Sequence, residues 1–205
     1  MAIVGLASVV WFGGLVLLWR KNLTRWIMLG ISLSVCLFLL LPGRPTGDLT
    51  AAYQAHLKRY EGVPYVWGGE NGFGIDCSGL TRKAMIDTLF ESGLRNLNSG
   101  PIRAALDLWW NDSSAKAIGE EYRGLTRKIV GTPSLNALDH DLIRPGDLAV
   151  TQSGLHIMAY LGEHRWIEAD PGFGRVVIMN VPSDNSWFQT AMTIVRWSFL
   201  EGEKN

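Results

Sequence analysis

Two long segments without a charged residue occupy most of the first fifth of this 205-residue chain. They cover residues 2–19 and 26–41. A helix that spans a bilayer needs about 20 apolar residues, with a range of roughly 17–25. The first segment meets this length, and the second meets it when the two residues after it are added. We therefore expect a membrane anchor over residues 1–42, with transmembrane helices at 2–19 and 26–42.

The short connection between the two segments is basic and is flanked by tryptophans. It contains Arg20, Lys21 and Arg25, with Trp19 and Trp26 on its two sides. Basic loops stay in the cytoplasm, and tryptophan favours the membrane interface. This pattern predicts a two-pass protein of the inner (cytoplasmic) membrane, with the C-terminal domain on the periplasmic side. A cleaved signal peptide is the alternative, but no small-x-small cleavage site follows the second segment.

Charge and cysteine usage narrow the classes of function. The chain has 19 Lys and Arg against 19 Asp and Glu, with no basic stripe, so a nucleic-acid partner is not expected. Its two cysteines are Cys36, inside the second apolar segment, and Cys77. Since they belong to different parts of the chain, we expect no disulfide between them. Val35 precedes Cys36, whereas a lipid anchor requires a small residue at that position.

Residues 43–205 have the pattern of one α+β domain. Apolar residues at helical spacing predict a helix over 48–60, and a second helix follows from Cys77 to Glu91, ended by Ser92-Gly93. Short apolar runs separated by turns then predict antiparallel strands at 148–151, 155–161, 165–169, 175–179 and 193–197. Helices followed by a meander of strands predict helices packed on one side of a sheet.

The middle of this domain, residues 94–140, carries no chemical motif. Its pieces at 102–110 and 115–125 have helical patterns. Trp109 and Trp110 are expected to line the core or a groove rather than to form a stacking platform.

Cys77 is the best candidate for a chemical function. It follows a loop that contains Gly68, Gly69, Gly72 and Gly74, and it opens an apolar-periodic stretch. The thiol is therefore expected at a helix N-terminus. Unpaired backbone N–H groups and the helix dipole favour an anion there, and the thiolate is the nucleophilic form of cysteine.

A cysteine nucleophile needs a base within hydrogen-bond reach. Among the four histidines, His156 is favoured because it begins the apolar strand segment 156–161. His56 is expected to be solvated on the first helix. His140 lies in a polar stretch, and His164 lies beside a turn, where exposure is expected.

The pairing of two predicted strands suggests a third polar group. A hairpin that pairs His156 directly with Glu168 puts both side chains on one face and needs an odd-length loop, with Gly162 in the left-handed conformation. A two-residue turn at Gly162-Glu163 would put Glu168 on the other face. A register shifted by two residues would place Asp170 opposite His156 instead. We favour Glu168 over Asp170 and leave the second option open.

Together these residues resemble the NlpC/P60 family of cell-wall cysteine peptidases. The resemblance lies in residues 62–69, in Asp76-Cys77-Ser78-Gly79-Leu80, and in Arg144-Pro145-Gly146-Asp147-Leu148 followed by 156–162. It covers roughly residues 48–198 apart from the middle segment. It implies a papain-like fold, with the cysteine helix packed on the antiparallel sheet that carries the histidine. It also implies cleavage of peptidoglycan stem peptides, commonly between D-glutamate and diaminopimelate.

The resemblance also implies roles for single residues. Cys77 matches the nucleophile, His156 the general base, and Glu168 the third residue, which in the family is usually a neutral His, Asn or Gln. A carboxylate can still orient the imidazole and stabilise its protonated form. The separation of Cys77 and His156 is long for the family, so the middle segment is an enlargement that reshapes the groove.

Three more positions match the family's substrate site. Tyr65 corresponds to a tyrosine whose hydroxyl can assist the oxyanion beside the Cys77 backbone N–H. Asp76 and Ser78 correspond to positions that shape the substrate subsites. No cofactor is expected, and no metal is expected because the histidines lack ligand spacing.

The expected function is therefore that of a membrane-anchored cysteine peptidase with peptidoglycan or its muropeptides as substrate. Two alternatives remain. One is an amidase or acyltransferase of the same superfamily that acts on another amide or a lipid ester. The other is a catalytically inactive wall-binding or scaffold protein.

Overall fold

The N-terminal part of the chain contains one long apolar helix. The computed structural model describes residues 9–11, 13–14, 16 and 22–201, so most of the first predicted span, 2–19, lies outside the described residues. Among the described residues, only α2 (Asn22–Leu40) is long and apolar enough to cross a membrane. The second predicted span, residues 26–42, therefore corresponds to a helix, whereas the two-pass arrangement stays a prediction.

Helix α2 begins earlier than the sequence pattern indicates. Its first residues, Asn22–Arg25, were expected in a loop and are helical instead. None of them is a glycine or proline, so nothing in this stretch interrupts a helix that the apolar residues after it stabilise. The helix ends just before Pro42, which cannot continue it.

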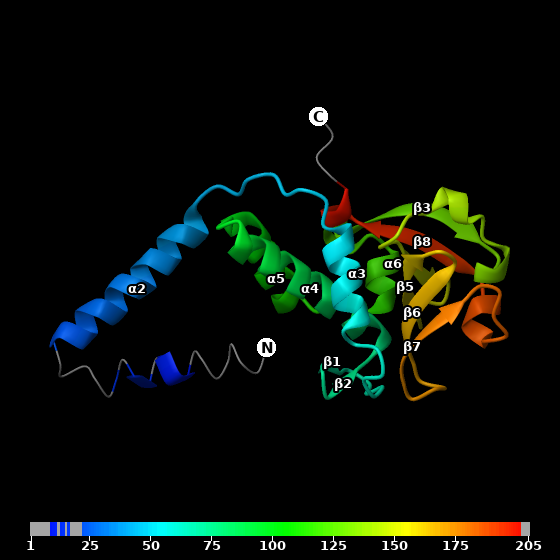
Figure 1. Cartoon of the computed structure of the whole chain (residues 1–205), viewed down its shortest axis with the longest axis horizontal. Helices are drawn as coiled ribbons and strands as arrows, with labels where there is room; N and C mark the ends of the chain where they lie inside the picture. Colours follow the sequence, from blue (N-terminus) through cyan, green and yellow to red (C-terminus); the bar gives the residue numbers. More distant parts are fainter. Residues whose placement is uncertain (1–8, 12, 15, 17–21, 202–205) are drawn as a thin grey trace.

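The domain that follows has a helical layer and a sheet (Figure 1). The helices are α3 (Thr50–Lys58), α4 (Cys77–Arg95), α5 (Ser99–Trp110) and α6 (Ala115–Gly119). Short 3-10 turns lie at η1 (Tyr122–Gly124), η2 (Leu135–Ala137), η3 (His140–Leu142), η4 (Ser186–Gln189) and η5 (Ser198–Leu200).

Within the described residues, six strands pair in the order β3-β8-β4-β5-β6-β7, and every neighbouring pair is antiparallel. They are β3 (Thr126–Thr132), β4 (Leu148–Thr151), β5 (Ile157–Gly162), β6 (Arg165–Asp170), β7 (Arg175–Asn180) and β8 (Met192–Trp197). A small ribbon of β1 (Glu70–Asn71) and β2 (Gly74–Ile75) precedes α4. The α+β class with an antiparallel sheet is therefore confirmed.

Both faces of the sheet are buried. Successive side chains along a strand point to opposite faces, and each face packs in its own core. In β5, Ile157 and Ala159 pack in the core with the helices, whereas Met158 and Tyr160 belong to a second core on the opposite face. As predicted, the helices lie on one side of the sheet. The second core is closed by residues of η2 and η4, including Leu135 and Phe188.

Two predicted helix ends are wrong. Helix α4 passes through Gly93, because this glycine lets α5 approach: a Cβ there would lie 2.5 Å from Ile102 Cγ1. The glycine thus serves packing between helices rather than helix termination. The helix expected over 115–125 ends at Gly119, and Glu121 has a left-handed φ of 60°.

The β5–β6 hairpin has a different register from the one predicted. Its turn is Glu163-His164, with φ of 53° and 59°, values typical of a two-residue type I′ turn. Gly162 pairs with Arg165, and a bulge at the next step shifts the pairing so that Ala159 faces Ile167. Continued to His156, this pairing would place Asp170 opposite. Since the shift from the predicted register is two residues, Glu168 still points to the face of His156.

Candidate active site

Cys77 is the first residue of α4 and is buried. Asp76 caps this helix, as its Oδ1 accepts hydrogen bonds from Gly79 N at 2.7 Å and from the Ser78 hydroxyl at 3.0 Å. Its Oδ2 accepts from Gly68 N at 2.8 Å. Asp76 therefore joins the glycine-rich loop to the helix start and fixes the position of the thiol.

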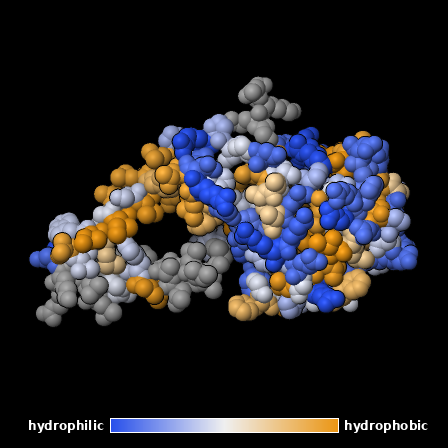
Figure 2. Space-filling view, viewed as in Figure 1, coloured by the Kyte–Doolittle hydropathy of each residue, from blue (hydrophilic) through white to orange (hydrophobic). Residues whose placement is uncertain are grey.

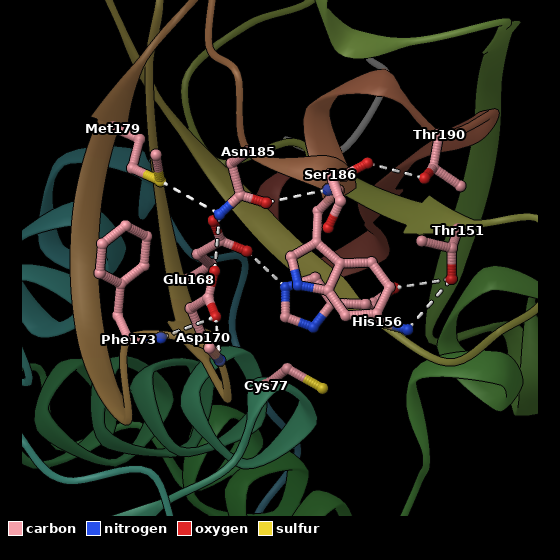
Figure 3. Close-up of polar contacts among 12 residues, drawn as sticks. Cys77, Thr151, His156, Glu168, Asp170, Phe173, Met179, Asn185, Ser186 and Thr190 are labelled. Atoms are coloured by element: carbon pink, nitrogen blue, oxygen red, sulfur yellow. Dashed lines mark hydrogen bonds and ion pairs between the residues drawn. The ribbon is translucent and has the colours of Figure 1, made fainter.

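His156 lies directly before β5 and is held from several sides (Figure 3). Its backbone N–H donates to Thr151 Oγ1 at 3.0 Å. Its Nε2 is 2.5 Å from Glu168 Oε2, and its ring stacks on Trp187 at a centroid distance of 4.4 Å and an angle of 15°. The imidazole thus has a fixed position and a fixed plane.

The same contacts direct the second ring nitrogen toward the thiol. Nε2 is hydrogen-bonded to Glu168, so Nδ1 is the ring nitrogen available to Cys77. Figure 3 shows the imidazole ring between the side chains of Glu168 and Cys77. Burial lowers the pKa of His156, but hydrogen bonds with Cys77 and Glu168 and the charges of both outweigh it and raise the pKa to about 9. The imidazole is therefore set up to hold a proton at neutral pH.

Glu168 lies on β6 and is fully buried. Burial raises the pKa of its carboxyl group, the bond and charge of His156 act in the opposite direction, and nearby Asp170 raises it further. Its Oε1 has no hydrogen-bond partner within the described residues. The carboxylate therefore depends on His156 for its stabilisation, which couples the two groups.

Asp170, the alternative third residue, forms its hydrogen bonds with groups other than His156. It accepts hydrogen bonds from the backbone N–H groups of Gly172 and Phe173 in the β6–β7 turn, and from Asn185 Nδ2 at 2.7 Å. Asn185 Oδ1 in turn accepts from Trp187 N at 2.9 Å. Asp170 therefore supports the tryptophan that stacks on the imidazole, and Glu168 is the carboxylate in contact with the ring.

Trp187 was not singled out from the sequence. It lies in η4, far along the chain from the cysteine and histidine motifs, and no motif surrounds it. Only the fold brings it to His156.

Cys77 opens onto a groove with a volume of about 440 Å³. Tyr65, Asp76 and Ser78, the residues predicted for the substrate site, all line it. Burial and the charges of Cys77, Asp76 and Asp170 raise the pKa of Tyr65 to about 12. Its hydroxyl thus stays protonated at neutral pH and can donate a hydrogen bond. As predicted, Trp109 also lines the groove, whereas Trp110 is exposed.

An arginine links the two sides of this groove. Arg82 lies on α4 and is buried, and its Nη1 is 2.6 Å from Asp112 Oδ1 and 2.8 Å from Glu70 Oε1. Its Nη2 donates to the Leu108 carbonyl at 2.8 Å. Burial raises the pKa of Glu70, although the charge of Arg82 lowers it. The cysteine helix is thereby joined to the segment after α5.

The remaining histidines lie away from the groove. The prediction that His56 is solvated is wrong. This histidine is buried, because α3 packs against α4 and places its Nε2 2.9 Å from Glu91. His164 is exposed as expected, and its ring lies 4.4 Å from that of His140. Among the described residues, no group of three or more His, Cys, Asp or Glu side chains is placed to hold a metal ion.

Comparison with known proteins supports the resemblance seen in the sequence. Residues 62–98, which carry the glycine-rich loop and Cys77, match the model of the NlpC/P60 family. The resemblance to this family is thus confirmed for the part of the chain that holds the cysteine. No curated protein sequence matches the chain.

Three solved structures illustrate the structural similarity. The NlpC/p60 domain of the peptidoglycan hydrolase SagA is 24% identical with a TM-score of 0.42, over 71% of this chain and 97% of that one. The peptidoglycan hydrolase RipB from Mycobacterium tuberculosis is 20% identical with a TM-score of 0.44, over 71% of this chain and 63% of that one.

The third is RipD from Mycobacterium tuberculosis, described as a non-catalytic NlpC/p60 domain protein adapted to peptidoglycan binding. It is 18% identical with a TM-score of 0.42, over 74% of this chain and 98% of that one. Since all three scores are below 0.5, the function has to be judged from the site itself.

Proposed function

We propose that this chain, whose cysteine segment matches the NlpC/P60 family, is a membrane-anchored cysteine peptidase that hydrolyses amide bonds in peptidoglycan stem peptides. The bond is of the D-glutamate–diaminopimelate type. One observation carries the proposal: a cysteine at a helix N-terminus faces an imidazole held by Glu168 and Trp187, beside an open groove. A binding module has no need of this arrangement.

The first half of the reaction is acylation of Cys77. Its proton moves from Sγ to Nδ1 of His156, because Nε2–H is bonded to Glu168. The thiolate then attacks the carbonyl carbon of the scissile amide. The resulting oxyanion accepts hydrogen bonds from the Cys77 backbone N–H, at the free end of α4, and from the protonated Tyr65 hydroxyl.

Loss of the amine completes acylation, and hydrolysis of the thioester then returns the enzyme to its starting state. The imidazolium of His156, with a pKa of about 9, gives its Nδ1 proton to the leaving amine as the C–N bond breaks. Water then attacks the thioester carbonyl while the neutral imidazole accepts its proton. The C–S bond breaks, the carboxylic acid leaves, and Sγ of Cys77 takes the proton back from Nδ1 of His156. Glu168 stays bonded to Nε2 throughout and stabilises each imidazolium that forms.

Digestion of purified muropeptides by the full chain in detergent, followed by mass spectrometry, tests this proposal. We expect one amide bond in the stem peptide to be cleaved, and no product from Cys77→Ala. Cys36→Ala is the matched control and should keep full activity, since this second cysteine is exposed on α2, away from the groove.

Three results would contradict the proposal. Full activity of Cys77→Ala would remove the cysteine mechanism. Retention of muropeptides without cleavage would favour the inactive wall-binding protein. Cleavage of a different amide, or of a lipid ester, would favour the amidase or acyltransferase.

The same proposal places the domain outside the cytoplasm. Its support is the basic cluster of Arg20, Lys21 and Arg25, which overlaps the start of α2, together with the apolar character of α2, which is sufficient to span a membrane. A phosphatase fused after Asn205 should be active in the periplasm, and a reporter that needs the cytoplasm should be inactive there. The opposite pattern would remove access to the cell wall.

A further inference from the structure

The segment that follows α2 is hydrogen-bonded to the tip of the α4–α5 hairpin, which is the loop of residues 96–98. Arg44 N donates to Asn98 Oδ1 at 3.0 Å, and Asn98 Nδ2 donates back to the Arg44 carbonyl at 2.8 Å. The Arg44 guanidinium donates to the carbonyls of Asn96 and Leu97 at 2.6 and 3.1 Å. Residues 41–44 are therefore held against the domain rather than acting as a free linker.

One face of α5 binds the end of α2 directly. The Ser99 hydroxyl donates to the Leu41 carbonyl at 2.7 Å, and Arg103 Nη1 donates to the carbonyls of Leu39 and Leu41, both at 2.6 Å. The last carbonyls of a helix have no partner within the helix, so these donors cap α2. The face of α5 that carries Ser99 and Arg103 thus points toward α2.

The same face continues as an exposed apolar stripe. Residues four, seven and eleven positions after Ser99 share its face of the helix, and these are Arg103, Leu106 and Trp110. Leu106 is 36% exposed and Trp110 is 79% exposed. On the opposite face, Ala105 and Leu108 are buried in the core, so α5 already has its packing partner inside the domain.

The tip of the hairpin adds to this stripe. Leu94 is 54% exposed and Leu97 is 75% exposed, although the backbone of Leu97 is held by Arg44. These side chains therefore project from a fixed backbone beside the C-terminal end of an apolar helix. Figure 2 shows that the hydrophobic surface of α2 extends up to its junction with the domain.

We propose that this face of α5, with Leu106, Trp110 and the hairpin tip at Leu97, lies on the surface of the lipid bilayer that α2 enters. A bilayer around α2 would reach the side of α5 to which the end of α2 is bound, and Figure 1 shows α5 starting beside that end and running sideways from the axis of α2. Tryptophan and leucine on one face of a surface helix are suited to the membrane interface.

Two contacts with the membrane fix the orientation of the domain relative to the bilayer. A single membrane helix joined to the domain by a free linker would not fix it. With α2 inserted and α5 on the surface, the groove beside Cys77 keeps a set height and direction relative to the membrane. The substrate is then restricted to stem peptides within reach of the bilayer. This inference rests on the proposed membrane anchoring, so the experiment must test the anchor and the stripe separately.

The test uses the full chain in vesicles of phosphatidylcholine and phosphatidylglycerol. Three single-cysteine variants, Trp110→Cys, Lys128→Cys and Leu33→Cys, are made in a Cys36→Ser, Cys77→Ser background and labelled with an environment-sensitive fluorophore. Lipids with a nitroxide near the headgroup then quench labels at the interface, and lipids with a nitroxide on the acyl chain quench labels inside the bilayer, such as the one at position 33. Lys128 is the control, because it is exposed on β3, the edge strand on the far side of the domain from α2.

We expect the label at position 110 to lose most of its fluorescence with the nitroxide lipids, and the label at 128 to respond only to aqueous iodide. The label at 33 reports on the anchor, since Leu33 is an exposed residue of α2. Quenching at 33 without quenching at 110 would overturn the inference and leave the anchor intact. No quenching at either position would overturn both. Self-quenching at 110 that increases with protein density, without lipid quenching, would favour a second copy of the chain and overturn the bilayer contact.

Discussion

The two sides of the groove are built in different ways. On one side, Cys77 and His156 are 6% and 1% exposed, and they come from α4 and the start of β5, which pack together in the core. On the other side, Trp67 is 82% exposed and the Asp112 side chain is 91% exposed, and both lie in irregular segments. The groups proposed for chemistry thus have fixed positions, whereas those that a substrate would meet first can adapt.

The largest effect is expected on the buried side. His156→Ala removes both the acceptor of the thiol proton and the donor to the leaving amine. General acid–base catalysis is worth about 10²–10⁴-fold, so kcat should fall by at least that range. Steady-state hydrolysis of a muropeptide measures it. His164→Ala is the control, because this histidine is exposed in the β5–β6 turn, and equal losses in both variants would contradict the assignment.

Substitution of Glu168 should have the next largest effect. In Glu168→Gln, the amide oxygen can still accept the Nε2–H bond, so substantial activity should remain. Glu168→Ala should lose more, because the ring loses a bond that fixes its orientation, but less than His156→Ala. Equal kcat values for Glu168→Ala and the wild type would show that the buried contact has no part in the reaction.

The pH profile separates an orienting role of Glu168 from an electrostatic one. The charge of Glu168 helps to raise the pKa of His156 to about 9, so wild-type kcat should fall as the pH rises through about 9 and the imidazolium is lost. Glu168→Gln removes that charge and lowers the pKa of His156. Its loss of activity should therefore begin at a lower pH, and an unchanged profile would contradict the coupling.

The difference between fixed and adaptable parts of the molecule is related to what could be predicted from the sequence. The helix start at Cys77 was predictable because its signals are local: a glycine-rich loop, a capping aspartate and an apolar pattern. Glu168 was selected with a hairpin register that was two residues wrong. The choice survived because side chains alternate along a strand, so a shift of two residues keeps the same face.

Other features depend on contacts between distant segments. Trp187 reaches His156 from a 3-10 turn, and His56 is buried only because α3 packs on α4. Strand β3 was missed because it lies at the edge of the sheet, where the exposed Arg127 and Lys128 weaken the strand pattern. Trp187 and His56 have no local signal in the sequence, and the local signal of β3 is weak.

The effect expected at Trp187 lies between those on the buried and the exposed side of the groove, since this residue is half-buried and touches His156 without reacting. Aromatic stacking contributes about 0.5–1.5 kcal/mol, so Trp187→Ala should lower kcat by up to about tenfold. Trp187→Phe keeps a stacking ring and should recover most of the loss. Burial lowers the pKa of His156, so its exposure in Trp187→Ala should move the alkaline limb to higher pH, opposite to Glu168→Gln. A shift to lower pH would contradict this role.

The smallest effect is expected on the exposed side, at Asp112. Its ion pair with Arg82 has one partner that is almost fully exposed, and such pairs contribute about 0–1 kcal/mol, or at most about a fivefold change. Arg82 also keeps its contacts with Glu70 and the Leu108 carbonyl, so the segment after α5 should stay in place. Asp112→Asn should therefore change KM by a small factor and leave kcat nearly unchanged. If Asp112→Asn instead lowered kcat as much as Glu168→Ala, the exposed side would take part in the chemistry, and the division between the two sides would be wrong.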